Sequence, residues 1–189
     1  MPVFKKFVKY YKPYRFVFWM DMFCALIVSV VDLAFPQILN WATRDLFTHG
    51  AQAIYRILPW MAGGLLAMYI LRFLGRYYIT YQGHVMGARM ESDMRQDLFD
   101  HFQRLSFSYY DRNNTGEMMS KLVSDLFDIA EFAHHGPENL FISLVKIIGS
   151  FIFLFLINWR LALPLVFLVF CMFVFSFRQN RRMQETFME

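Results

Sequence analysis

The chain has 189 residues, of which 57% are hydrophobic, 20% are aromatic and only 18% are charged. So few polar residues exclude an ordinary soluble domain, and we expect an all-α membrane protein with the lipid bilayer as a partner. The formal net charge is +4, but the basic residues form no single stripe, so we expect no nucleic-acid partner.

Residues 1–15 combine lysines with aromatic and apolar residues. Lys5, Lys6 and Lys9 alternate with residues such as Phe7, and Pro13 interrupts the helical pattern before the first apolar segment. This pattern predicts an amphipathic N-terminal elbow, which is a short helix in the headgroup layer followed by a bend. The alternative is a frayed basic terminus held only by surface charge.

Four apolar segments are long enough to cross about 30 Å of hydrocarbon as helices. They cover residues 16–41, 58–79, 140–157 and 161–177. The loop Thr43–Ile57 joins the first two segments, and the tight connection Asn158–Arg160 joins the last two. A long hairpin over residues 80–139 lies between the second and third segments. Residues 16–189 therefore predict four transmembrane helices with long helical extensions outside the membrane.

Basic residues are concentrated on one side of this topology. They lie in the N-terminal segment, the central arms and the C-terminal segment, namely Lys5, Lys6, Lys9, Lys12, Arg15, Arg72, Arg76, Arg89, Arg95, Arg104, Arg112, Lys121, Arg178, Arg181 and Arg182. The opposite side has only Arg44, Arg56 and Arg160. By the positive-inside rule both termini and the hairpin are cytoplasmic, and we expect an integral protein of a bacterial plasma membrane.

Two amphipathic helices form the arms of the hairpin. Their apolar stripes consist of Met90, Met94, Leu98, Phe102 and Leu105 in the first arm, and of Met118, Leu122, Leu126, Ile129 and Ala133 in the second. Each arm reaches about 40 Å from the bilayer. Between the arms, Asn113, Asn114 and Gly116 favour a turn, and Thr115 and Glu117 begin the returning helix. A turn held so far into the water predicts a partner at the tip.

The residues that often carry metal chemistry are few. Cys24 and Cys171 fall inside predicted spans, where a lone thiol behaves as a small apolar side chain. His134 and His135 are neighbours on a helix, so their side chains point about 100° apart, and no cysteine or paired carboxylate accompanies them at ligand spacing. We therefore expect no metal site.

Glycines do not form a phosphate-binding loop in this sequence. No glycine-rich loop ends in Gly-Lys-Ser/Thr, so the chain has no ATP cradle of its own. Gly83-x-x-x-Gly87 predicts a close contact between helices instead. We expect no enzyme activity, no catalytic residues and no cofactor in this chain by itself.

The hairpin resembles the first intracellular loop of the ABC exporter transmembrane domain. The matching elements are Asp93-Met-Arg95, Leu105–Asp111, Thr115-Gly-Glu117, Ser120-Lys-Leu122 and Ser124-Asp125. The basic elbow and the connection Asn158-Trp-Arg-Leu-Ala-Leu163 support the resemblance, which extends over essentially the whole chain. The chain is similar to the N-terminal part of a type I half-transporter of the multidrug, lipid or peptide export kind.

This resemblance implies parts that the chain does not contain. Members of the family have six spans per half and a nucleotide-binding domain, which binds ATP and Mg, in the same or a companion chain. We therefore expect a piece of a longer half-transporter or a truncated gene product, and a homodimer or heterodimer of half-transporters. Residues 178–189 resemble the start of the second intracellular loop.

In this family a short helix at the loop tip docks on the nucleotide-binding domain. The resemblance implies that role for Ser108, Tyr109, Tyr110, Asp111 and Arg112. Aromatic rings supply contact area at low entropic cost, and the flanking charges set the register of an interface. In the alternative interpretation, Phe107 and Tyr110 only close the tip of the hairpin.

Five aromatic residues of the spans allow two interpretations. These residues either line an amphipathic cavity or pack the helices against one another, and they are Tyr69, Phe73, Tyr77, Phe141 and Phe151.

Charged side chains in a span cost about 3 kcal/mol each, so Asp21, Asp32 and Lys146 each need a partner or a wet cavity. Asp21 and Lys146 lie at similar depth, which suggests an intramembrane ion pair, whereas Asp32 is too far along its helix to reach Lys146. The alternative is that Lys146 extends to the headgroups and Asp21 faces water in the cavity.

Two other functions stay open at the level of the sequence. A self-standing helical membrane scaffold would bind a cytoplasmic partner through the hairpin tip. A channel-like protein would conduct ions without nucleotide.

Overall fold

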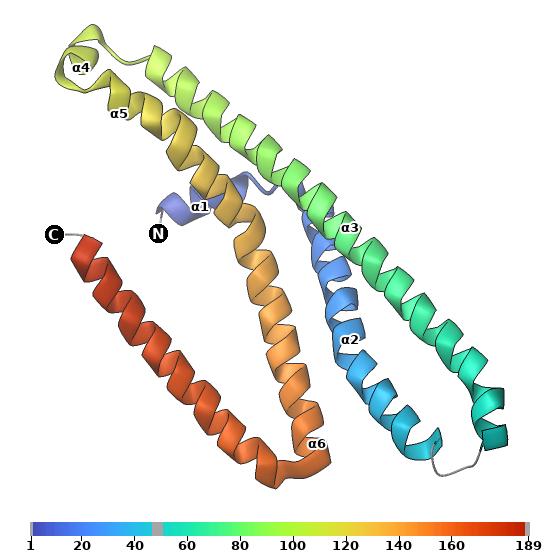
Figure 1. Ribbon diagram of the computed structural model, residues 1–189. Helices are drawn as coiled ribbons and strands as arrows, with labels where there is room; N and C mark the ends of the chain where they lie inside the picture. The colour runs from blue at the N-terminus through green and yellow to red at the C-terminus, as the bar shows by residue number, and fades with distance from the viewer. Residues whose placement is uncertain (1, 47–50, 188–189) are drawn as a thin grey trace. The chain divides into compact units, whose positions relative to one another are not determined.

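The computed structural model describes residues 2–46 and 51–187 (Figure 1). Within these two ranges every element is helical, as the composition predicts, and there is no strand. The chain divides into two compact units, Met1–Val145 and Lys146–Glu189.

The helical elements follow in the order α1 (Pro2–Lys9), α2 (Arg15–Leu46), α3 (Ala51–Gln103), α4 (Phe107–Arg112), α5 (Thr115–Ser120), the π-helical turn η1 (Lys121–Asp125) and α6 (Leu126–Phe187). The first unit holds every element from α1 to η1. It also holds α6 as far as Val145, which is about five turns at about 3.6 residues per turn. The second unit holds the rest of α6.

In the part of the chain that the structure describes, three helical stretches are long and apolar enough to cross a membrane. They are Arg15–Arg44, Tyr55–Gln103 and Thr115–Met183. The first two contain the predicted spans 16–41 and 58–79, and the third contains both 140–157 and 161–177. The count of four spans stays a prediction.

The loop predicted over Thr43–Ile57 is too long. Helix α2 continues to Leu46 and α3 begins at Ala51, so only residues 47–50 are left between them, and these lie outside the described residues. The predicted bounds of the helices follow the fall in hydropathy at each end. Polar residues at the end of a long helix keep its backbone hydrogen bonds, so the helix extends beyond its apolar segment.

In the second unit, α6 is interrupted at Asn158, which has a non-helical backbone (φ −159°, ψ 97°). The side-chain Oδ1 of Asn158 accepts a hydrogen bond from the backbone N–H of Arg160 at 3.1 Å. This amide therefore satisfies one of the free N–H groups at the start of the following helical segment. The break falls inside the tight connection predicted over Asn158–Arg160.

In the first unit, α2, α3 and the start of α6 pack along three small cores, the third of which joins Met94 of α3 to Leu126 and Ala130 of α6. Ala25 and Val28 of α2 meet Ile79 of α3, and Met86 and Met90 of α3 meet Ala133 of α6. Residues along both predicted stripes of the hairpin are buried, namely Met90, Met94, Met118, Leu122, Leu126 and Ala133.

The prediction that Ile129 belongs to the buried stripe is wrong. Ile129 is 41% exposed, and Ala130, at 3% exposure, takes its place in the contact with Met94. Ala130 lies about 40° from Leu126 around an α-helix, and Ile129 lies about 60° away on the other side. Either residue can continue the stripe from Leu126, and the packing against α3 selects Ala130.

The N-terminal elbow packs against the hairpin. The chain leaves the helix after Lys9 and resumes it at Arg15, and Phe7 and Tyr10 lie against Met94, Leu126 and Ala130. The position of the elbow in the headgroup layer stays a prediction.

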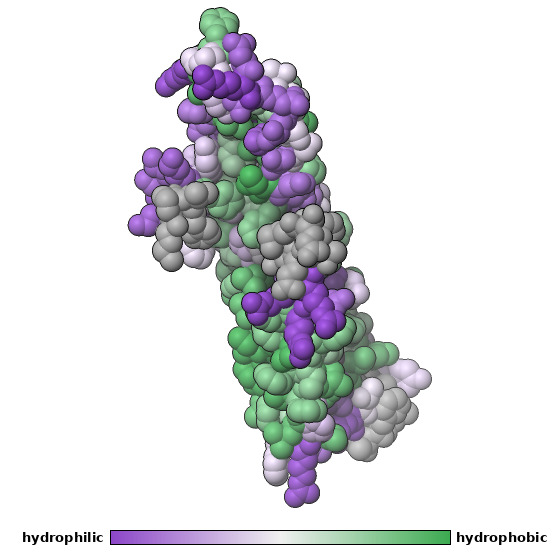
Figure 2. All heavy atoms as spheres, turned by 90° about the vertical axis from the view of Figure 1, so that its left-hand side faces the viewer, coloured by the Kyte–Doolittle hydropathy of each residue, from purple (hydrophilic) through white to green (hydrophobic). Residues whose placement is uncertain are grey.

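Hydrophilic side chains gather at the end of the first unit that carries α4 and α5, as Figure 2 shows. This fits helical arms that extend into water.

Candidate functional site

The five predicted coupling residues lie together on α4, a six-residue helix at the end of the hairpin. Extended residues bound it on both sides, Ser106 (φ −73°, ψ 155°) and Asn113 (φ −118°, ψ 146°). Helix α4 is therefore a separate element between the two arms, and none of its residues is buried.

Hydrogen bonds fix α4 on the end of α3. The Tyr110 hydroxyl donates to the carbonyl oxygen of Phe102 at 2.5 Å, and the Asn113 side-chain amide donates to the carbonyl oxygen of Tyr109 at 2.8 Å. The hydroxyls of Ser106 and Ser108 lie 3.0 Å apart. Tyr110 is half-buried, so its ring and hydroxyl stabilise the tip, which is the role that the alternative interpretation gave it.

Phe107 is the most exposed large apolar side chain of the tip, at 90%. Tyr109 is 38% exposed, and its ring lies edge-on to that of Tyr110 with 6.0 Å between centroids. From the sequence, Phe107 has a role only in the alternative interpretation, in which it closes the tip. An apolar ring held in water on a structured helix is a stronger indication of an interface than an aromatic that closes a turn.

The returning helix begins as predicted, at Thr115. The Asn114 side-chain Oδ1 accepts a hydrogen bond from the Gly116 N–H at 2.8 Å and caps this helix. Gly116 itself is inside α5, so the prediction that it belongs to the turn is wrong. Asn114 supplies the cap, which lets the helix start one residue before the glycine.

Contacts between the arms hold the tip in place. Arg95 Nε on α3 donates to the carbonyl oxygen of Leu122 on η1 at 3.2 Å. This carbonyl belongs to the π-helical turn, where the regular helical hydrogen bonds are rearranged, and the arginine provides it with an additional donor.

Three tyrosines tie the elbow to the arms. Tyr10 donates to Asp97 Oδ2 at 2.7 Å, Tyr14 donates to Asp93 Oδ2 at 2.9 Å, and Tyr11 donates to the carbonyl oxygen of Ala133 at 2.7 Å. Burial and the hydrogen bond to Asp97 raise the pKa of Tyr10 to about 12, so its hydroxyl stays a donor at neutral pH.

The residues predicted to line a cavity do not form one group. Tyr69, Phe73 and Tyr77 lie four residues apart on one face of α3 and are 58%, 65% and 60% exposed. Phe141 instead packs against the core of Ala25, Val28 and Ile79. Phe151 belongs to the second unit. The cavity therefore stays a prediction.

The charged residues of the spans have different surroundings. Asp21 is 1% exposed in the first unit, while Lys146 belongs to the second unit, so their ion pair stays a prediction. Asp32 forms an ion pair with Arg72, with 2.6 Å between Oδ1 and Nε. The positive-inside prediction includes Arg72 among the cytoplasmic cations. Because it pairs with an aspartate of the first span, it is no evidence for orientation.

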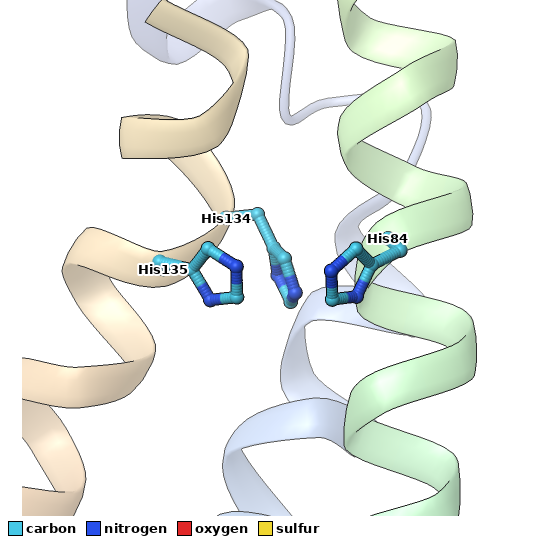
Figure 3. Close-up of side chains that lie close together, drawn as sticks. All are labelled: His84, His134 and His135. Atoms are coloured by element: carbon cyan, nitrogen blue, oxygen red, sulfur yellow. The ribbon is translucent and has the colours of Figure 1, made fainter. Parts of the chain in front are cut away.

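Histidines and carboxylates gather where α2, α3 and α6 meet. His84, His134 and His135 converge (Figure 3), and one ring nitrogen of each lies within 4.8 Å of those of the other two. Asp21, His134 and Glu138 form a second such group. Neighbouring histidines on a helix are predicted to diverge, and the sequence pattern indicated no cysteine or paired carboxylate beside them. Glu131 and Glu138 lie one turn before and after the pair, and the pattern did not reveal their role.

The contact predicted at Gly83-x-x-x-Gly87 is present in the structure. A Cβ added to Gly83 would lie 1.8 Å from Cε1 of His134, and one added to Gly87 would lie 3.5 Å from the His134 Cβ. Because Gly83 and Gly87 have no side chain, the imidazole of His134 on α6 fits against α3 at these two positions.

Comparison with known proteins places these observations in a family. The protein family described as "ABC transporter transmembrane region" matches residues 18–189 of this chain. The chain belongs to the ABC transporter transmembrane family. This membership confirms the resemblance of the hairpin to an ABC exporter loop, and it covers nearly the whole chain.

Relatives of this ABC transporter domain include proteins from several bacteria. It is 41% identical to the uncharacterized ABC transporter ATP-binding protein YwjA of Bacillus subtilis, over 97% of this chain and 31% of that protein. It is 30% identical to the ATP-dependent lipid A-core flippase of Shewanella oneidensis, over 85% of this chain and 29% of the flippase. The chain therefore spans less than a third of the length of these relatives.

Proposed function

We propose that this chain is the transmembrane-domain portion of an ATP-driven exporter, and that α4 couples it to a nucleotide-binding domain. A single observation carries the proposal: α4 is a separate short helix at the end of two long helical arms, with Phe107 90% exposed at its start. A large apolar ring in that position suits a pocket on a partner better than it suits water.

The arrangement divides the tip into an anchoring side and a presented side. Tyr110 holds α4 to the end of α3 through its hydrogen bond to Phe102, while Phe107 and Tyr109 are available to a partner. A partner that moved α4 would move both arms, because Arg95 and the buried methionines join α3 to the returning helix. ATP and Mg would be bound by the nucleotide-binding domain, which would close on a second half-transporter.

Removing the presented rings is expected to uncouple the exporter. In the full-length protein, Phe107→Ser with Tyr109→Ala should weaken docking at least about tenfold, because truncated aromatic anchors typically cost 2 kcal/mol or more each. The measurement is the change in thiol labelling of a cysteine at Phe73 on adding ATP and vanadate in nanodiscs. The native protein should show the change and the double variant should lose it.

Phe127→Ser is the matched control, since Phe127 is another exposed phenylalanine, 52% exposed, on the returning arm instead of α4. It should respond to ATP and vanadate like the native protein. A normal response in the Phe107 and Tyr109 double variant would refute the assignment of α4 as the coupling element.

We further propose four spans with both termini in the cytoplasm, in a bacterial plasma membrane. The break of α6 at Asn158 supports a return of the chain after residue 157, and both segments on either side are apolar. The exposed aromatic face of Tyr69, Phe73 and Tyr77 would contribute to the substrate pathway, and a second half-transporter would complete it.

Thiol labelling tests this topology directly. In a background without Cys24 and Cys171, cysteines at Arg56 and Arg160 should react with a membrane-impermeant reagent added to intact cells. Cysteines at Asn113 and Arg178 should react only in inside-out vesicles. Labelling of Arg178→Cys from the outside, with Asn113→Cys still inside, would mean three spans and refute the proposed fourth.

A further inference from the structure

Three imidazole rings from two helices of the first unit meet at one place (Figure 3). The ring centroid of His84 on α3 lies 5.1 Å from that of His134 and 5.2 Å from that of His135, both on α6, and the latter two are 4.4 Å apart. A donor nitrogen from each ring lies within 4.8 Å of the other two. This spacing is within reach of one common ligand of the three rings.

His134 is the central member, and it has no hydrogen-bond partner. It is 3% exposed, and neither Nδ1 nor Nε2 has a partner within hydrogen-bond distance. A buried polar group without a hydrogen-bond partner lowers the stability of the fold by about 1–3 kcal/mol, so native structures rarely contain one without a reason. Gly83 leaves the space that the ring occupies, because any Cβ there would overlap it.

Glu138 adds a carboxylate beside the rings. It is 5% exposed, and its Oε2 lies 3.8 Å from His134 Nε2 and 3.7 Å from His135 Nδ1. In a tetrahedral zinc site with bonds of about 2.0–2.1 Å, neighbouring donor atoms are about 3.3 Å apart. Small side-chain rotations would therefore bring these atoms to ligand spacing.

The outer ring nitrogens already have the partners that metal-bound histidines use. Nδ1 of His84 lies 2.7 Å from the carbonyl oxygen of Thr80, and a carbonyl only accepts. Nδ1 of His84 therefore carries the proton, and the lone pair of Nε2 is free for a ligand. Nε2 of His135 lies 3.4 Å from Glu131 Oε2, which leaves Nδ1 toward Glu138.

Asp21 brings a second carboxylate to the same place. A carboxylate oxygen of Asp21 lies within 4.8 Å of donor atoms of His134 and Glu138, and Asp21 is 1% exposed. Two buried carboxylates this close repel each other and are costly to remove from water. A single divalent cation beside neutral imidazoles would balance both charges.

From this geometry we propose that His84, His134, His135 and Glu138 bind one divalent transition-metal ion of the zinc class, which joins α3 to α6. Imidazole nitrogens with one carboxylate in a four-donor set favour zinc over the oxygen-preferring magnesium and calcium. The site is distinct from α4, and its test does not depend on transport or ATP hydrolysis.

The test is metal titration of the full-length protein, purified in detergent and first stripped with a chelator. Cobalt should produce the intense visible absorption of tetrahedral coordination at one equivalent, and zinc should displace it. His84→Ala and His135→Ala should each weaken zinc binding at least about tenfold in competition with a chromophoric chelator, and Glu131→Gln should weaken it by a similar factor. His84 is exposed and His135 half-buried, so both variants should fold.

His101→Ala provides the matched control, because His101 is an exposed histidine on the same helix as His84. Its zinc affinity should equal that of the native protein. The proposal is overturned if neither metal binds at one equivalent, or if His84→Ala and His135→Ala bind zinc as the native protein does. The rings would then be a packed cluster of neutral imidazoles.

Discussion

Gly83→Ala is expected to lower the free energy of unfolding by about 2 kcal/mol or more. The new Cβ would lie 1.8 Å from Cε1, 2.5 Å from Nε2 and 2.7 Å from Nδ1 of His134, so the buried ring must move or the helices must separate. This loss exceeds the roughly 1 kcal/mol that alanine gains over glycine in a helix. Thermal unfolding in detergent with a chelator present measures packing without any contribution from metal.

Gly64→Ala is the control for the substitution at Gly83. Gly64 lies in the same helix, and nothing lies within 4 Å of a Cβ added there. This variant should keep the native unfolding midpoint or raise it slightly. Equal midpoints for the two variants would show that α6 does not approach Gly83 as closely as the structure has it.

Asp32→Asn is expected to destabilise the protein by about 2–3 kcal/mol. The substitution leaves the guanidinium of Arg72 without the carboxylate that lies 2.6 Å from it, inside the apolar part of α2 and α3. An arginine in the middle of a span costs about that much on insertion scales. Unfolding in detergent or the yield of inserted protein would measure the loss.

The double variant Asp32→Asn with Arg72→Met separates the pair from either residue alone. It should recover most of the lost stability, because the unpaired charge is gone and methionine suits the apolar surroundings. Glu117→Gln breaks an ion pair of similar length, 2.8 Å to Lys121, on the exposed surface of α5 and should have little effect. Simple addition of the Asp32 and Arg72 effects would mean that the two side chains do not interact.

Several local features of the chain could be predicted because they depend on neighbours in the sequence. Asn114 caps the returning helix at Thr115 through a bond to the N–H two residues on, and the Asn158 break depends on its own side chain in the same way. The spacing of Gly83 and Gly87 predicts a helix contact, since four residues place both on one face. The sequence did not predict that His134 is the side chain that faces these two glycines.

The sequence by itself determined the helical class, the apolar segments, the ABC exporter resemblance and the position of the tip, because these depend on composition and local pattern. Tertiary structure alone decided that Ala130 replaces Ile129 in the core, that Phe107 faces water, and that Arg72 pairs with Asp32. It also brought His84 to His134 and His135. The physical reason is that periodicity gives each helix an apolar face, whereas the rotation and offset between helices decide which distant side chains meet.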